Sequence, residues 1–476
     1  MARLVVVSNR VAIPGRDGGG RAGGLAVAIR PVLRRHPGIW FGWSGRVAAK
    51  SQVAVRTIAR GKQTYVLADL AEDDYQEYYN GFANRVLWPI LHYRLDMAEF
   101  SRRDLSGYMR VNAQFAGELH KILAADDIVW VHDYHLLPLA KALRQLGHRN
   151  KIGFFHHIPF PPPEILTALP NHEHLIPAMC HYDLVGFQTD RDATNFARYL
   201  RDECGMPSRD PYTFQAAGRT VRIGAFPVGV ETAQLNRLAR RAVHSPFVRE
   251  VVDSLASRVM IIGVDRLDYS KGIALRMEAF DRFLAANPEW RGKVTYLQIT
   301  PKSRSEIREY AEMQRDIDET AGRINGKYGE AAWTPIRYVN RTHTRSALAG
   351  LYRSAGAALV TPLRDGMNLV AKEYVACQDP ENPGVLILSR FAGAAVECDA
   401  ALLVNPYDPE SVGTAIGKAL SMPLEERRSR HDALFQVLMA NDVKNWGERF
   451  LAALTRPLHS PSRVGQASAL AAGELP

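Results

Sequence analysis

Long hydrophobic runs, paired cysteines and internal repeats are absent from this 476-residue sequence. No apolar run approaches the roughly 20 residues that a membrane-spanning helix needs. The four cysteines are sparse and form no C-x-x-C pair, which gives no sign of a disulfide framework and indicates a reduced, cytoplasmic protein. With 46% hydrophobic and 23% charged residues, the chain has an ordinary globular composition and length enough for two or three domains.

Acidic residues are also missing over a long stretch, because none occurs from Gly18 to Ala68. The formal net charge is +10, yet the basic residues of this stretch are scattered singly rather than gathered in a run. No helix-turn-helix, zinc-finger or aromatic ribonucleoprotein motif accompanies them, which argues against a nucleic-acid partner. A positive cleft for small anionic substrates and a solvated basic face both account for the charge.

What the sequence does contain is a regular alternation of strand-like and helical segments. Runs such as RLVVVS, DIVWVHD and KIGFFHH occur in the first half, and RVMIIGVD, KVTYLQIT and GVLILS occur in the second. This alternation predicts an α/β protein of two Rossmann-like, doubly wound parallel-sheet domains that face a cleft. We expect the domains to span residues 1–235 and 236–455, with a single connection near 231–258 and a disordered tail at 456–476.

Two phosphate-binding signatures are incomplete. GGGRAG at 18–23 matches G-x-G-x-x-G, but it lies ten residues after its strand and the next acidic residue is Asp69, so a dehydrogenase is not indicated. A G-x-x-x-x-G-K-[ST] loop is absent. A loop in which the Gly23–Gly24 backbone approaches an anion at a helix start fits the sequence instead.

Polar residues follow two strands of the first half. VWVHDYHLL and FFHHIPFPPPE carry His132, Asp133, His135, His156 and His157. The spacing supplies no third ligand for zinc, so we expect no metal site. A strand-end Asp and His suit hydrogen bonds to sugar hydroxyls, whereas His132 and His156 are interpreted as core histidines.

Two loops of the second half carry charges at equivalent strand ends. VDRLDYSKGI places Arg266 and Lys271 before a helix, which together form a receptor for a diphosphate. TPLRDGMNLVAKEY places Asp365 in a loop and Glu373 in the first turns of the following helix. Since ligands of open parallel sheets bind at the carboxyl ends of the strands, we expect both loops to line one site.

Together these segments resemble the trehalose-6-phosphate synthase family over about residues 1–455. The motifs that carry the resemblance are VVVSNR, GGLAV, WFGWSG, EYYNGFANRVLWP, HDYHLLP, GFFHHIPFP, DRLDYSKG, AGRINGKYG and TPLRDGMNLVAKEYV. The resemblance implies a retaining glycosyltransferase of the two-domain GT-B fold. It also implies transfer of glucose from a nucleotide sugar, usually UDP-glucose, to glucose 6-phosphate.

The resemblance implies a role for individual residues as well. It assigns the acceptor site to Arg10, Tyr79, Asp133 and Arg304, and anomer selectivity to Trp88 and Ile158. It assigns the donor site to Gly23, Gly24, Arg266, Lys271, His343, Asp365, Leu369, Val370, Ala371, Lys372 and Glu373. The expected catalytic residues are His157, Asp365, Arg266, Lys271 and Asp133. His343 stands where some relatives carry phenylalanine, which leaves the base of the donor (UDP, GDP or ADP) open.

The same resemblance implies a homodimer or homotetramer, no cofactor and no divalent cation, because Arg266 and Lys271 would stabilise the leaving diphosphate. Attack on the same face of the sugar, with a donor phosphate oxygen taking the proton, replaces the carboxylate nucleophile of retaining glycosidases. Three alternatives remain at this point: a sister enzyme that uses glycerol 3-phosphate, a sugar-phosphate sensor without turnover, and a dehydrogenase.

Overall fold

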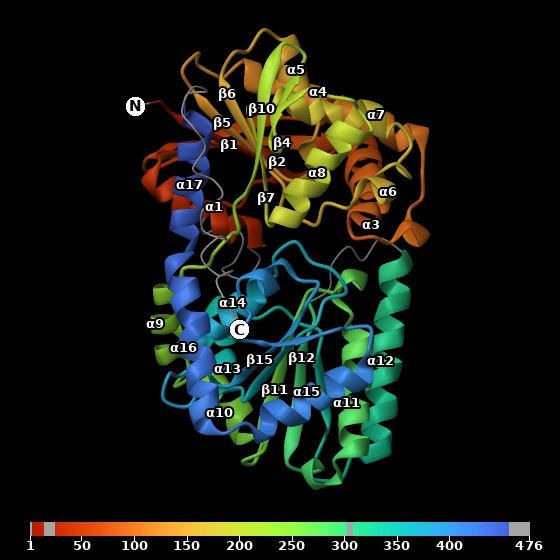
Figure 1. Ribbon diagram of the computed structural model, residues 1–476, viewed down its shortest axis with the longest axis vertical. Coiled ribbons are helices and arrows are strands. Elements are labelled where there is room, and N and C mark those ends of the chain that lie inside the picture. Colours follow the sequence, from red (N-terminus) through yellow and green to blue (C-terminus); the bar gives the residue numbers. More distant parts are fainter. Residues whose placement is uncertain (1, 14–23, 302–307, 457–476) are drawn as a thin grey trace, which may run out of the picture.

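The computed structural model describes residues 2–13, 24–301 and 308–456 of the chain. They form two lobes, one above the other in Figure 1, and each lobe is built on its own sheet. The tail expected to be disordered falls almost wholly outside the described residues.

The first lobe contains a sheet of ten strands among the described residues, in the order β3-β4-β2-β1-β5-β6-β7-β10-β9-β8. Neighbours from β4 to β10 pair in parallel, and only the edge pairs β3–β4, β10–β9 and β9–β8 are antiparallel. The central strands are nearly continuous apolar runs because helices bury both of their faces. The strands are β1 (Leu4–Arg10), β2 (Gly38–Ala48), β3 (Val55–Arg60), β4 (Gln63–Ala71), β5 (Ile128–His132), β6 (Lys151–Phe155), β7 (Leu184–Phe187), β8 (Ser208–Asp210), β9 (Thr213–Ala216) and β10 (Arg219–Ala225).

The second lobe contains a six-stranded sheet, again counted over the described residues, in the order β13-β12-β11-β14-β15-β16. All of its neighbouring strands pair in parallel. Both sheets therefore confirm the predicted α/β class with parallel sheets. The strands are β11 (Val259–Val264), β12 (Val294–Ile299), β13 (Ile336–Val339), β14 (Ala357–Val360), β15 (Val385–Ser389) and β16 (Leu402–Val404).

Helices connect the strands and cover both sheets (Figure 1). Those of the first lobe include a π-helix, η3 (Tyr75–Leu87), which runs directly into the short helix α3 (Trp88–Leu91). The others there are α1 (Gly24–Arg35), α2 (Glu72–Asp74), α4 (Arg102–His120), α5 (Leu139–Gln145), α6 (Pro163–Leu166), α7 (His172–Leu175) and α8 (Asp190–Asp202). After the first sheet come α9 (Thr232–Ala242), α10 (Pro246–Asp253), α11 (Ile273–Ala286), α12 (Arg308–Tyr328), α13 (Arg345–Ser354), α14 (Leu369–Cys377), α15 (Pro409–Ser421), α16 (Leu424–Ala440) and α17 (Val443–Thr455).

The last helix returns to the first lobe. Figure 1 shows α17 beside α1, and its contacts include β6 and β7. The ring of Phe450 stacks on Trp130 with centroids 4.6 Å apart, and a Cβ at Gly153 or Gly186 would lie within 2.8 Å of the Phe450 ring. The chain thus crosses between the lobes twice, so the expected single connection is wrong, and the end of the range 236–455 packs on the first sheet.

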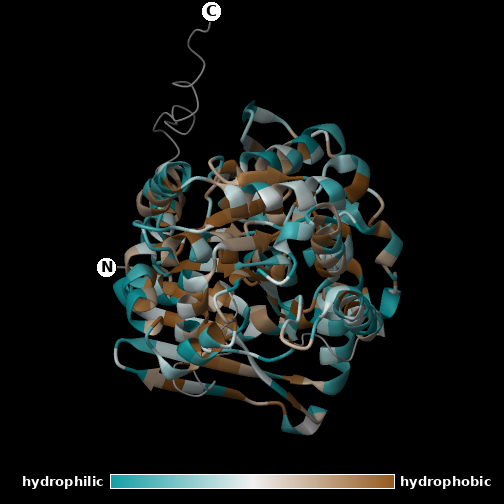
Figure 2. Ribbon diagram, turned by 90° about the horizontal axis from the view of Figure 1, so that it is seen from below, coloured by the Kyte–Doolittle hydropathy of each residue, from teal (hydrophilic) through white to brown (hydrophobic). Residues whose placement is uncertain are grey.

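Buried apolar side chains fill the space between sheets and helices. Figure 2 shows the hydrophobic colour gathered on interior strands and the hydrophilic colour on the outer helices. One hydrophobic cluster runs from the face of the first sheet under α1 and α17 to the face of the second sheet under α13 and α14. Because this cluster is continuous, the two lobes share part of their core.

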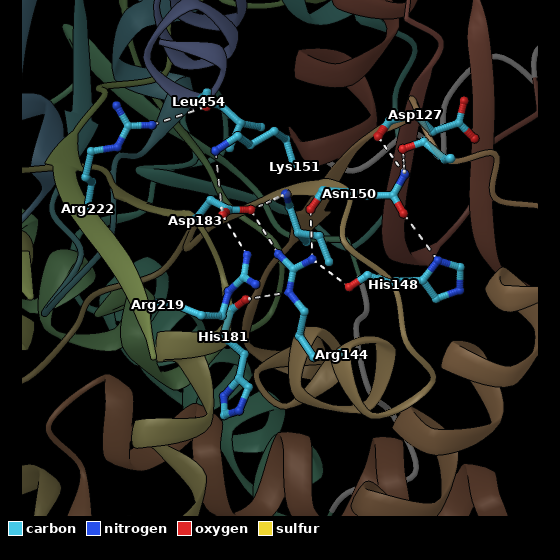
Figure 3. A network of polar contacts seen from close by, with 12 residues as sticks. Asp127, Arg144, His148, Asn150, Lys151, His181, Asp183, Arg219, Arg222 and Leu454 are labelled. Carbon is cyan, nitrogen blue, oxygen red and sulfur yellow. Dashed lines mark hydrogen bonds and ion pairs between the residues drawn. The ribbon is translucent and has the colours of Figure 1, made fainter. Parts of the chain in front are cut away.

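A charged network lies at the amino ends of β5, β6 and β7, the edge opposite the expected site (Figure 3). The carboxylate of Asp183 accepts hydrogen bonds from Arg144 at 2.9 Å, from Arg219 at 3.0 Å and from the amide of Ile152 at 2.8 Å. Several basic side chains therefore stabilise strand starts rather than a ligand site. Among the described residues, no helix combines the length and the apolar character that crossing a bilayer would require.

Candidate active site

A cavity of about 680 Å³ lies between the carboxyl ends of the two sheets. Its walls include residues of the loops that follow β5, β6, β11 and β14, so both lobes contribute. Strand-end residues gather here because all of these strands run parallel toward the cavity. The residues in question are Asp133, His157, Arg266 and Asp365.

The first-lobe wall is built around Asp133, which takes a positive φ of 78° at the turn after β5. Its carboxylate accepts a hydrogen bond from the amide of Tyr134 at 3.0 Å and a longer one from the amide of His157 at 3.4 Å. The ring of His157 pairs with that of His132, Nε2 to Nδ1, at 3.0 Å. Burial lowers the pKa of His157 to about 3, so its imidazole is neutral near pH 7.

Arg266 crosses the cavity and meets the first lobe. Its guanidinium lies 4.7 Å from the centre of the Trp88 ring, a cation–π contact between the lobes. It also donates to the carboxylate of Asp268 at 3.2 Å, and Asp268 is itself held by the amide and hydroxyl of Ser270 at 3.0 and 2.8 Å. These contacts fix the loop after β11 so that Arg266 points into the cavity.

Lys271 and Asp365 form an ion pair within the second-lobe wall, in which the ammonium donates to Oδ2 of the carboxylate. The side chains are only 12% and 15% exposed. Asn368 donates to the same carboxylate oxygen at 3.0 Å and caps α14 by accepting from the amide of Ala371 at 3.3 Å. A fixed carboxylate before α14 and a cation before α11 that could bind a phosphate therefore lie side by side.

Gly366 is a point at which the two lobes approach each other closely at this wall. A Cβ there would lie 2.2 Å from the carbonyl oxygen of His157, so a side chain could not be accommodated without moving the backbone. Nearby, the guanidinium of Arg364 lies 3.8 Å from the centre of the Tyr93 ring of the first lobe. The loop between β14 and α14 is thus held directly against the His157 segment.

A carboxylate and two arginines line the other end of the cavity. Glu231, which precedes α9, bonds Arg34 of α1 at 2.6 Å and Arg345 of α13 at 3.3 Å. Nε and Nη2 of Arg345 are buried and have no partner among the described residues. Glu373 lines the same region, and burial raises the pKa of its carboxyl against the opposing effect of Arg345.

Beneath the cavity floor lies a buried arginine. Arg276 is 1% exposed and donates to Asp265 at 2.7 Å, to Thr361 at 2.9 Å and to the carbonyl of Lys271 at 3.1 Å. It therefore connects the ends of β11 and β14 to the start of α11. Buried charges are retained only with such complete pairing.

The family model described as Glycosyltransferase family 20 matches residues 4–456 of this chain. The chain belongs to glycosyltransferase family 20. A curated relative from Sinorhizobium fredii named trehalose-6-phosphate synthase is 53% identical over 457 residues, covering 96% of this chain and 98% of the relative.

Solved structures agree with this assignment. An α,α-trehalose-phosphate synthase from Burkholderia xenovorans in complex with glucose 6-phosphate has a TM-score of 0.93 and 47% identity, covering 96% of this chain and 100% of that one. An E. coli structure named trehalose-6-phosphate and bound with UDP-2-fluoro glucose has a TM-score of 0.91 and 45% identity, with coverages of 96% and 100%. The two facing parallel sheets are thus the GT-B fold that the sequence predicts.

Two acceptor residues implied by the family resemblance, Arg10 and Tyr79, both lie beside the ring of Trp43. Arg10 lies 5.8 Å from the centre of the Trp43 ring, and the rings of Tyr79 and Trp43 are 5.5 Å apart. Tyr79 also stacks on His135, with centroids 5.9 Å apart and an interplanar angle of 11°. Neither Arg10 nor Tyr79 belongs to the wall of the 680 Å³ cavity, which Trp88 and Asp133 border on this side.

The donor residues expected from the family fall into three groups. Gly23, and the acceptor residue Arg304, lie outside the described residues. Ala371 and Lys372 are fully buried and do not line the cavity, and the Lys372 ammonium is bonded to the carbonyl of Val228 at 2.8 Å and to the carboxylate of Glu397. The remaining expected donor residues line the cavity, as does Ile158: Gly24, Arg266, Lys271, His343, Asp365, Leu369, Val370 and Glu373.

His343 reaches the cavity from the loop before α13. Its ring lies 5.2 Å from that of Phe247, at an interplanar angle of 31°, and burial lowers its pKa. The described residues contain no group of three or more His, Cys, Asp or Glu side chains that could hold a metal ion.

Sequence reasoning missed Arg276, Glu231 and Arg345. A single arginine inside an amphipathic helix or at its first turn is ordinarily solvated, so their local sequence gives no signal. Glu231 was visible only as the start of the segment between the lobes. Its importance depends on Arg34 and Arg345, which are 197 and 114 residues distant from it in sequence.

Proposed function

We propose that this chain transfers glucose from UDP-glucose to glucose 6-phosphate, giving α,α-trehalose 6-phosphate and UDP. The observation that carries the proposal is the cavity between the sheets. It combines two cations beside helix starts, a fixed carboxylate and sugar-facing groups of the first lobe. Relatives of this chain are named trehalose-6-phosphate synthase, and similar structures hold glucose 6-phosphate and UDP-2-fluoro glucose.

The donor diphosphate binds between Arg266 and Lys271 in this proposal. When the bond between C1 of glucose and the diphosphate oxygen breaks, negative charge develops on the leaving UDP. Two cations held in place beforehand stabilise that charge without reorganising during the reaction. The amides of Leu369 and Val370 at the start of α14 add the partial positive charge of a helix N-terminus.

The donor sugar and ribose contact the remaining cavity groups. Asp365, already oriented by Lys271 and Asn368, accepts hydrogen bonds from glucose hydroxyls, and His157 contacts the same sugar from the first lobe. Glu373 binds the ribose hydroxyls. His343 contacts the base, Gly24 approaches the donor from the start of α1, and the family resemblance adds Gly23 to the donor contacts.

The acceptor binds on the first-lobe side. Arg10, Tyr79 and Arg304 bind the phosphate of the acceptor. Asp133 orients the hydroxyls of the acceptor's sugar ring. Trp88 and Ile158, which border the cavity, select the α anomer of the acceptor. The 1-hydroxyl then attacks C1 of the donor glucose on the face that UDP leaves, and its proton passes to an oxygen of the departing diphosphate.

A matrix of three donors (UDP-, GDP- and ADP-glucose) and three acceptors (glucose 6-phosphate, glucose and glycerol 3-phosphate) tests this function. Release of the nucleoside diphosphate is measured against time for each combination. We expect UDP-glucose with glucose 6-phosphate to give the highest kcat/KM. Turnover with glycerol 3-phosphate alone would indicate the sister enzyme, and binding without turnover would indicate a sensor.

Assembly and location also stay predictions. We propose a homodimer or homotetramer in the cytoplasm, with small-molecule substrates and no nucleic-acid partner. Light scattering coupled to size-exclusion chromatography measures the assembly directly, and a mass of one chain at all concentrations would contradict it.

A further inference from the structure

A pair of histidines connects the cavity wall to the core of the first lobe. Nδ1 of His132, at the end of β5, lies 3.0 Å from Nε2 of His157, which follows β6. His132 is 0% exposed, whereas His157 lines the cavity. Since Nε2 of His157 is used in this pair, Nδ1 is the ring nitrogen that remains for a ligand.

The hydrogen bond between the two rings contains a single proton. Burial lowers the pKa of both histidines, so each imidazole is neutral and carries one N–H and one lone pair. Two arrangements are then possible. Either His157 donates from Nε2 to His132, or His132 donates from Nδ1 to His157.

The first arrangement places the proton of His132 on its Nε2. That atom is buried and has no hydrogen-bond partner among the described residues. Buried N–H groups without a partner are rarer than buried acceptors without one, and each costs about 1–3 kcal/mol. The second arrangement leaves only a lone pair at this position.

The described residues around His132 offer no acceptor for an N–H on its Nε2. Its ring lies 4.6 Å from that of Trp130 and 6.3 Å from that of Trp446, measured between centroids. The indole N–H groups of both tryptophans are themselves buried without a partner among the described residues, so the pocket is already short of acceptors. A weak contact of an N–H with an aromatic face recovers only about 0.5–1 kcal/mol.

We propose that His132 is a positioning residue that holds His157 in the Nδ1–H tautomer, so that His157 presents an N–H donor to the cavity. His157 then binds an oxygen acceptor and rejects a ligand group that can only donate. Resting on the proposed function, that acceptor is a hydroxyl oxygen of the transferred glucose. The hydroxyl remains free to donate its own proton elsewhere.

Nitrogen-15 NMR of the full chain labelled at histidine reads the tautomer without any substrate. The shifts of the two ring nitrogens distinguish a protonated from an unprotonated position, and His157→Asn identifies the His157 signals. We expect Nδ1 of His157 to carry the proton and Nε2 to be an acceptor. A His157 ring protonated at Nε2 in the unmutated protein would overturn the proposal.

Three variants separate positioning from packing. In His132→Asn the side-chain amide can occupy the place of Nδ1 and donate the same bond, whereas His132→Phe removes the donor and keeps an aromatic ring. His431→Phe, a change at another buried histidine in α16, is the matched control. We expect the His157 tautomer to survive in the Asn and control variants and to be lost in His132→Phe.

Activity provides a second readout. At metal sites, removing a group that orients a ligating histidine typically costs about 10- to 100-fold, and we take this as the scale for a positioned histidine here. We expect a loss on this scale in kcat/KM for the sugar donor in His132→Phe, largely restored in His132→Asn. An unchanged tautomer and unchanged kcat/KM in His132→Phe would refute the role.

Because the NMR measurement needs no turnover, absence of transferase activity would contradict the proposed function and leave the tautomer test intact. If His132→Phe does not fold, the unmutated protein and His132→Asn still decide the tautomer.

Discussion

Replacing Asp365 by asparagine should change nucleotide binding and turnover in opposite directions. Without a donor, the ammonium of Lys271 bonds the Asp365 carboxylate, and both side chains are largely buried. A donor diphosphate must draw Lys271 from this carboxylate or share it. Asp365→Asn keeps the shape and an acceptor oxygen but removes the charge that competes for Lys271.

The size of the effect follows from the strength of that bond. A hydrogen bond to a charged group contributes about 1.5–3 kcal/mol, and a neutral acceptor gives roughly half of this. The cost of withdrawing Lys271 therefore falls by about 0.8–1.5 kcal/mol in the variant, which is roughly a 4- to 12-fold gain in UDP affinity. Turnover should fall instead, because the amide has one acceptor oxygen and no charge, whereas the carboxylate accepts from glucose hydroxyls through two charged oxygens.

Isothermal titration with UDP measures the first effect, and steady-state kinetics with UDP-glucose and glucose 6-phosphate measures the second. Lys271→Met is the matched control, in which both UDP affinity and kcat should fall. Weaker or unchanged UDP binding in Asp365→Asn would refute the idea that Asp365 competes with the diphosphate for Lys271.

Four further predictions concern the same site. Arg266→Ala should lose about 2–4 kcal/mol of transition-state stabilisation, measured as kcat, and a near-normal kcat would exclude its role at the diphosphate. Activity should survive exhaustive chelation with EDTA, and its loss and recovery with one divalent ion would contradict metal independence. His156 and His157 both have a pKa lowered to about 3 by burial, so the unfolded chain binds more protons below pH 6.5. The free energy of unfolding should therefore be unaffected by these groups above pH 6.5. It should decrease as the pH falls from 6.5 toward 3, by up to about 1.4 kcal/mol per pH unit for each histidine, and a flat profile in denaturant titrations would contradict this. Arg304→Met should narrow the preference for glucose 6-phosphate over glucose by roughly 10- to 150-fold in kcat/KM, and an unchanged preference would leave Arg10 without this partner.

Much of the architecture could be predicted from local sequence patterns. Apolar runs followed by polar loops correctly indicate parallel strands, because buried strands have no polar face to interrupt the run, and the carboxyl ends of these strands border the cavity. The loops with Arg266 and Asp365 were expected to line one site, and both line the cavity. The return of α17 was not foreseen, because amphipathic spacing shows that a helix has a buried face without showing which sheet covers it.

The polar contacts between distant segments could not be predicted from local sequence either. Arg276 looks like any helix arginine in sequence, and its burial against Asp265 and Thr361 is decided by where β11 and β14 lie side by side. Lys372 was expected at the donor site from its place in the motif, but its side chain points instead to Val228 and Glu397. Which side of α14 a residue occupies depends on how the helix packs against the segment between β10 and α9, and a motif alone does not specify that.

The configuration of the product shows directly whether this chain transfers glucose to glucose 6-phosphate with retention. UDP-glucose labelled with carbon-13 at C1 is incubated with unlabelled glucose 6-phosphate and the full chain, and the product is followed by NMR. We expect one labelled disaccharide phosphate with the α configuration at both anomeric carbons, formed in step with UDP. Release of labelled free glucose, a β linkage, or no turnover would contradict it.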